Sequence, residues 1–119
     1  MRIEQDKDSA AILQPPRGRG QAEVSSAIAL VARERNVPIR LLVHFSRCRA
    51  KTARARQMAM YLSHVVFGVS LAEIGEAFGR DRTTVSYACG LIEDLRDDPV
   101  FDAEMDRLES VLLSGEGND

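Results

Sequence analysis

The most constraining feature of the sequence is the unbroken stretch from Ile74 to Leu95, which reads IGEAFGRDRTTVSYACGLIEDL. It starts as a short amphipathic helix, is interrupted by Gly79, and continues as a longer helix with helical spacing of its apolar residues. Two helices joined by so short a turn are typical of a helix-turn-helix. The second helix would begin with exposed donors and a methyl group that can meet base edges in a DNA major groove, on Arg82, Thr83, Ser86 and Tyr87.

Periodicity and turn residues divide the rest of the chain into further helices. Ser70 followed by Glu73 is a capping box, and Pro99 after Asp98 is a typical helix start. For the helix after Gly79, either Asp81 or Thr83 could be the N-cap. Helices are expected over 22–36, 39–46, 53–67, 71–78, 82–95 and 99–114.

These six helical signals, with no strand signal, predict an all-α domain that contains a helix-turn-helix. The expected inward residues include Met58, Leu62, Phe78 and Met105, and the second helix, with Ile39 to Phe45, is expected to be buried. Residues 1–21 are expected to form a flexible arm, in which Arg17 and Arg19 could still touch DNA. Residues 22–114 would form the helical domain and 115–119 a disordered tail.

Charge is distributed unevenly along the chain. Sixteen basic and eighteen acidic residues give a net charge of −2, which alone argues against a nucleic-acid partner. Positions 46–57, however, contain five basic residues and no acid, whereas positions 93–119 contain ten acids and only Arg96 and Arg107. A phosphate responds to the local field, so the basic run indicates a DNA-facing surface. Its members are Arg47, Arg49, Lys51, Arg54 and Arg56.

Several classes of function find no support in the sequence. Cys48 and Cys89 are far apart, and His44 and His64 are isolated, so neither a disulfide framework nor a metal site is expected. The acids lack the partners that catalysis requires, so we expect no enzyme and no cofactor. No apolar run of bilayer length and no signal-peptide pattern is present, which favours a cytoplasmic, nucleoid-associated protein without membrane contact.

Three segments carry a resemblance to a known family. ARQMAMYL at Ala55–Leu62, SLAEIGEAFG at Ser70–Gly79 and RDRTTVSYAC at Arg80–Cys89 resemble the C-terminal DNA-binding domain of the bacterial replication initiator DnaA. The similarity extends from about Val24 to Leu112. It implies Arg49 or Arg47 in the minor groove, Arg56 and Gln57 on the DNA backbone, and bases read by Asp81, Arg82, Thr83 and Thr84.

The residues and the resemblance together give one expected set of DNA contacts. It comprises Arg47, Arg49, Lys51, Arg54, Arg56, Gln57, Ser70, Arg80, Asp81, Arg82, Thr83, Thr84, Ser86 and Tyr87. Tyr87 is the most ambiguous member, because an aromatic residue on a helix flank is as often at the edge of a core.

The sequence also departs from the family pattern. The family usually has G-G-R-D-H-T-T, whereas Gly79–Thr84 reads GRDRTT, with one glycine fewer and arginine in place of histidine. Arginine prefers guanine, so the preferred bases would change. Gly90 and Leu91 stand where the family tends to have basic residues. The 119 residues contain no G-x-x-x-x-G-K-[ST] motif, so no nucleotide is expected to bind.

Two functions of different class follow. The first is a sequence-specific reader of double-stranded DNA that regulates transcription or modulates replication initiation, with transcriptional regulation narrowly favoured. The second is a protein-interaction module whose acidic last helix docks on a partner in the replication or transcription machinery through Glu104, Asp106 and Glu109. The target site, the genes regulated and the oligomeric state are not indicated.

Overall fold

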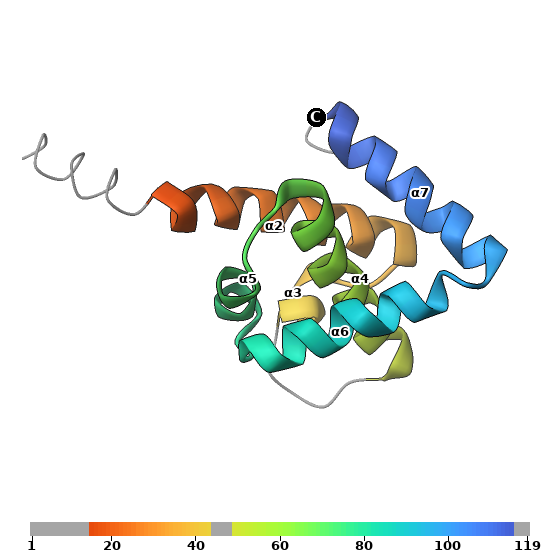
Figure 1. Ribbon diagram of the computed structural model, residues 1–119, viewed down its shortest axis with the longest axis horizontal. Helices are drawn as coiled ribbons and strands as arrows, with labels where there is room; N and C mark the ends of the chain where they lie inside the picture. Colours follow the sequence, from red (N-terminus) through yellow and green to blue (C-terminus); the bar gives the residue numbers. More distant parts are fainter. Residues whose placement is uncertain (1–14, 44–48, 116–119) are drawn as a thin grey trace, which may run out of the picture.

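A computed structural model describes residues 15–43 and 49–115. In these two ranges the chain forms helices and no strand, so the predicted all-α fold is confirmed. The elements are α2 (Pro15–Arg35), α3 (Ile39–Val43), α4 (Ala50–Phe67), α5 (Leu71–Phe78), α6 (Arg82–Leu95) and α7 (Pro99–Ser114) (Figure 1).

The α4 helix lies at the centre of the molecule, with α2 packed on one side and α6 on another (Figure 1). Apolar residues cover most of its circumference, so it has no exposed stripe along its middle. Burial on several sides removes more apolar surface from water than burial of one stripe, which makes α4 the main source of core stability. Its buried apolar residues include Met58, Ala59, Met60 and Leu62.

The α2 helix begins at Pro15, seven residues before the expected start at position 22. The expected arm is therefore wrong for residues 15–21, while residues 1–14 lie outside the described part. A proline is tolerated in the first helical turn because its missing N–H would have no partner there. Gly20 is buried against the α4–α5 connection, where a Cβ atom would lie 3.3 Å from Val69. A tertiary contact of this kind produces no periodic pattern in the sequence, so the sequence did not show that the helix begins before position 22.

The α3 helix differs more strongly from the expectation. It has five residues, Ile39–Val43, and within it Leu42 alone is buried. Ile39, Leu41 and Val43 are exposed, so the prediction of a buried second helix is wrong in this part. A helix of little more than one turn can present one residue to the core while its neighbours face outward. The end of the prediction, at Phe45 and Ser46, lies outside the described residues.

The turn between α5 and α6 requires a glycine on α5. A Cβ atom on Gly75 would lie 2.5 Å from the carbonyl oxygen of Arg80, so only glycine lets the turn approach α5. The predicted caps are confirmed at this unit: the Ser70 Oγ accepts the Glu73 amide at 3.1 Å, and Gly79 ends α5 in the left-handed region. The predicted helix-turn-helix is therefore present, with Phe78 fully buried beneath it.

The α7 helix starts at Pro99 and buries one face, as the sequence predicts. Met105, Leu108 and Leu112 lie inside, where α7 packs against α2 and α4, and Phe101 is half-buried. In the part of the chain described here, no helix combines the length and the apolar character needed to cross a bilayer.

Candidate nucleic-acid interface

The start of α4 and the start of α6 adjoin around a cavity of about 100 Å³. Its walls come from the first turns of α4, from the turn before α6, and from the first half of α6. Of the basic run, Arg56 lines this cavity, so α4 meets the helix expected to read bases a turn or two after its own start. The lining residues are Ala53, Arg56, Gln57, Met60, Arg80, Thr84, Tyr87 and Ala88.

Asp81 is the N-cap of α6. Its Oδ1 accepts a hydrogen bond from the Thr84 amide at 2.9 Å, which decides between the two caps that the sequence allowed. This backbone hydrogen bond holds the pKa of the Asp81 carboxyl below its usual value. The residues after the cap, Arg82, Thr83 and Thr84, are all exposed. The Asp81 carboxylate is therefore engaged in capping α6, and the three residues that follow it are exposed.

An outward line of residues runs along α6 opposite its buried stripe. Val85, Ala88 and Ile92 face the core, so a period of 3.6 residues places Thr83, Tyr87 and Gly90 on the far side. All three are exposed, and Tyr87 retains 69% of its surface. Tyr87 is therefore not a core-edge residue, and Ser86 lies exposed beside the same line.

The start of α4 presents cations that the fold does not neutralise. Within residues 15–43 and 49–115, neither Arg49 nor Lys51 forms an ion pair, and the same is true of Arg82 on α6. Both α4 residues are exposed. Arg54 donates from its Nε to the Gln57 Oε1 at 3.1 Å, so Gln57 holds one edge of that guanidinium. Arg47, the remaining residue of the predicted run, lies outside the described residues.

Arg56, which the resemblance places on the DNA backbone, is a buried residue in the structure. It is only 7% exposed, and its guanidinium donates to the carbonyl oxygens of Leu42 at 2.7 Å and Leu41 at 2.8 Å. These carbonyls belong to the last turn of α3, where the helix itself supplies no donor. Arg56 thus fastens α3 to α4, which does not fit the expected surface contact with the DNA backbone.

Ser70 and Arg80 also make contacts within the fold. The Ser70 hydroxyl caps α5, as described above, and Ser70 does not line the cavity. Arg80 is half-buried, donates to the Phe78 carbonyl oxygen at 2.8 Å, and does line the cavity. Of these two predicted residues, the structure brings only Arg80 to the junction of α4 and α6.

The described residues offer no group of three potential metal ligands. The His64 Nδ1 lies 2.9 Å from the Val69 carbonyl oxygen, so this histidine has a partner within the fold. Cys89 is a free, half-buried thiol; burial, and then the nearby Glu93 carboxylate, raise its pKa. A thiol of this kind is less reactive than an exposed one. His44 and Cys48 lie outside the described residues.

Arg96, at the end of α6, is the centre of a network that the sequence did not predict. Its guanidinium contacts three carboxylates of α7: Asp102 and Asp106 at 2.5 Å, and Glu109 at 2.7 Å. It also donates to the Tyr61 hydroxyl at 3.0 Å. Arg96 is 14% exposed, so it is largely removed from water and held by its partners. Its place as one of only two basic residues among ten acids is the sequence signal that could have indicated this role.

Other acids near α7 are paired too. Glu104 lies 3.4 Å from Arg35 of α2, and Glu34 accepts from Arg107 at 3.0 Å. The three acids of the alternative hypothesis, Glu104, Asp106 and Glu109, therefore all have basic partners inside the domain. Their main contribution is to attach α7 to the other helices.

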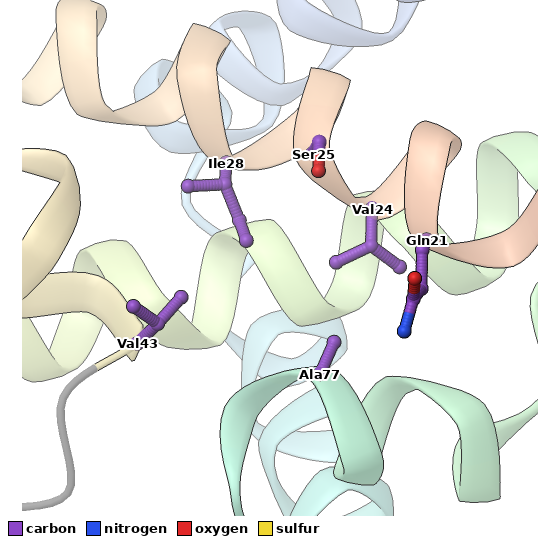
Figure 2. Close-up of a pocket in the computed structure, with 6 residues that line it drawn as sticks. All are labelled: Gln21, Val24, Ser25, Ile28, Val43 and Ala77. Atoms are coloured by element: carbon purple, nitrogen blue, oxygen red, sulfur yellow. The ribbon is translucent and has the colours of Figure 1, made fainter. Parts of the chain in front are cut away.

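A second cavity, of about 260 Å³, lies where α2, the end of α3 and α5 meet. Figure 2 shows Val24 and Ile28 of α2 pointing toward Ala77 of α5, with Val43 at the α3 end. Gln21 and Ser25 complete the lining. None of these side chains is charged, and none belongs to the expected set of DNA contacts, so this cavity is distinct from the candidate interface.

An all-α domain with a helix-turn-helix, an exposed cationic tip and a basic neighbouring helix has the features of a DNA-binding domain. Residues 24–92 match the family model described as "Bacterial dnaA protein helix-turn-helix". The chain therefore belongs to the bacterial DnaA helix-turn-helix family, a family of DNA-binding domains.

Similar proteins point the same way. The chain is 44% identical over 80 residues to the chromosomal replication initiator protein DnaA of Acinetobacter baumannii (strain AYE), which covers 66% of this chain. It is 39% identical over 88 residues, 73% of the chain, to the DnaA protein of a Synechocystis species. A crystal structure of a DNA replication initiation factor superposes with a TM-score of 0.76 at 26% identity, covering 92% of this chain and 36% of that one. The chain spans only 17% and 20% of the two DnaA relatives.

Proposed function

We propose that this chain is a sequence-specific double-stranded DNA-binding protein that regulates transcription or modulates replication initiation. The observation that carries the proposal is that α4 and α6 meet near their starts, and that both starts carry exposed cations with no ion-pair partner in the described residues. Membership of the DnaA helix-turn-helix family supports it.

In this proposal the tip of α6 and the start of α4 have different roles. The tip of α6 enters the major groove, where Arg82 reads a guanine and the Thr83 methyl contacts a thymine. Arg49, Lys51 and Arg54 lie on phosphates or reach the neighbouring minor groove, which fixes the register without reading sequence. Gln57 contributes by holding Arg54 at 3.1 Å.

Arg56 has no direct DNA contact in this scheme. Because its guanidinium bonds the Leu41 and Leu42 carbonyl oxygens, its role is to hold the start of α4 in place. The acidic α7 helix is not proposed as a docking site, since its acids are engaged with Arg35 and Arg96.

The experiment is a fluorescence titration of random-sequence duplex and of duplexes selected from a random library, at several salt concentrations. Three cations on phosphates, Arg49, Lys51 and Arg54, predict a slope of about −3 for log affinity against log salt. Selection should enrich one site, with affinity at least about a thousandfold above random sequence. Absence of duplex binding at low salt would contradict the proposal. Chromosomal occupancy in cells would then separate origin sites from promoters.

A further inference from the structure

The α3 helix concentrates apolar side chains at the surface. Within the described residues, three of the large apolar side chains that face solvent lie in its five residues: Ile39 is 53% exposed, and Leu41 and Val43 are each 37% exposed. The others are distributed over α4, α6 and α7. A local cluster of exposed apolar side chains is typical of a surface that another molecule covers.

This cluster adjoins the cavity between α2, α3 and α5. Val43 belongs to both, and Val24 and Ile28 of α2 face Ala77 of α5 across the cavity (Figure 2). An apolar cavity of about 150 Å³ admits a benzene ring, so the 260 Å³ present here can hold one large apolar side chain. Sites for small molecules are larger, roughly 300 to 1,000 Å³, and contain several convergent polar groups. Size and lining therefore fit an anchoring side chain of a protein.

Arg40 gives this surface a charge. Residues three and four positions apart lie on the same side of a helix, so Ile39 and Arg40 both lie beside Val43. Arg40 is exposed and forms no ion pair with any residue of 15–43 or 49–115. A cation one helical turn from an apolar cavity is complementary to a ligand that carries a carboxylate one turn from a large apolar side chain.

We propose that α3 and the adjoining cavity bind an amphipathic helix of a partner protein, with a large apolar side chain in the cavity and a carboxylate on Arg40. The two side chains would be three or four residues apart on the partner helix, because that spacing matches the separation of Arg40 from Val43 on α3. The cavity shares no residue with the junction of α4 and α6, so the partner and a DNA duplex can be bound together.

The test selects ligands for the full chain from a display library of helical peptides of about 18 residues, with the positions of one face randomised. Enriched peptides should have a large apolar residue three or four positions from Asp or Glu. The best of them, labelled with a fluorophore, should bind Ala77→Leu at least about tenfold more weakly, because the added side chain fills the cavity. The melting temperature of this variant should not fall, since leucine is nearly as good a helix former as alanine.

The charge is tested by reversal. Arg40→Glu should weaken the selected peptide about fivefold or more, and replacing the acid of the peptide by lysine should restore the affinity. Arg33→Glu is the matched control, because Arg33 is an exposed cation of α2 that does not line the cavity. It should change the affinity for the peptide less than about twofold.

Three results would overturn the inference. The first is selection without the apolar and acidic pattern, or equal peptide affinity of Ala77→Leu and wild type. The second is a concentration-dependent dimer in sedimentation that Ala77→Leu disrupts, because a second copy of the chain would then occupy the surface. The third is unchanged peptide affinity in Arg40→Ala together with a loss of duplex affinity equal to that of Lys51→Ala, which would place Arg40 on the DNA surface.

Discussion

The two charged regions of the molecule use their charges differently. Around the starts of α4 and α6, Lys51 and Arg82 are exposed and form no ion pair with any residue in the described ranges. At the α6–α7 end, Arg96 is largely buried among Asp102, Asp106 and Glu109. A charge without an internal partner can bind a ligand, whereas a charge with several partners mainly holds helices together. Local pairing therefore says more about function here than the net charge of −2.

Arg56 offers the sharpest test of this comparison, since it lies in the basic region but is bonded like Arg96. Arg56→Ala should lower the free energy of unfolding by about 3 to 4 kcal/mol, because two hydrogen bonds to a charged group are lost and two carbonyls lose their donor. Denaturant unfolding measures this change. The Arg56→Lys variant keeps the charge and can form one of the hydrogen bonds. Its free energy of unfolding should therefore lie between those of the wild type and Arg56→Ala. Unchanged stability with lost DNA affinity would instead place Arg56 on the DNA surface.

Substitutions at the α6–α7 end should change the stability of the protein and not its affinity for DNA. Arg96→Ala should cost about 2 to 3 kcal/mol of folding free energy, less than a fully buried pair, because Asp102 and Asp106 keep access to water. Thermal and denaturant unfolding will show the loss, and DNA affinity of the folded protein should change less than about twofold. Arg107→Ala, at an exposed pair with Glu34, is the control and should cost under about 1 kcal/mol. An equal cost of both variants would mean that the Arg96 network is no more than a surface pair.

Within the basic region, we expect two roles: some residues read bases and others position the protein on the DNA backbone. Arg82→Ala should lose about 1 to 3 kcal/mol of discrimination at a guanine, with little change in stability because its side chain is exposed. Lys51→Ala should weaken all duplexes alike and make the salt slope shallower by about 0.9. Titrations of matched and single-base-changed duplexes separate the two. The same sequence-independent loss in both variants would refute this division of roles.

The smallest expected effect concerns the acid at the edge of the basic region. Hydrogen bonding from the Thr84 amide lowers the pKa of Asp81 below its ordinary value of 3.8. The folded state therefore gains stability from ionised Asp81 above that value, and loses it as the pH falls through the lowered pKa. Relative to Asp81→Asn, which keeps a capping oxygen, the wild type should have the higher melting temperature at neutral pH; this advantage should start to shrink only below about pH 4 and vanish once the pH is below the lowered pKa. A constant difference across that range would contradict the assignment.

Local signals in the sequence predicted most of the fold. Ser70, Gly79 and Pro99 mark helix ends by side-chain and backbone preferences that act within a few residues, and the structure has helices ending or starting beside each of them. The contacts that were missed join distant positions. Arg56 reaches carbonyls 14 and 15 residues away, and Gly20 packs near Val69.

The candidate site was predictable to a similar extent. Exposure of Arg82 and Thr83 follows from the period of α6, because an amphipathic helix fixes which side is outside. The burial of Arg56 and the pairing of Arg96 depend on which helix ends meet in space. The presence of an arginine in the sequence does not reveal which groups will surround it. Whether Asp81 or Thr83 capped α6 likewise required the geometry of the turn.

The close approach at Gly75 has a practical consequence for redesign. Since the close approach at Gly75 holds the turn from the α5 side, we expect the angle of α6 to depend little on which residues occupy its outward tip. Residues 82–84 and 87 can then be exchanged in a library without rebuilding the scaffold, so new target sequences become accessible by changing a handful of codons.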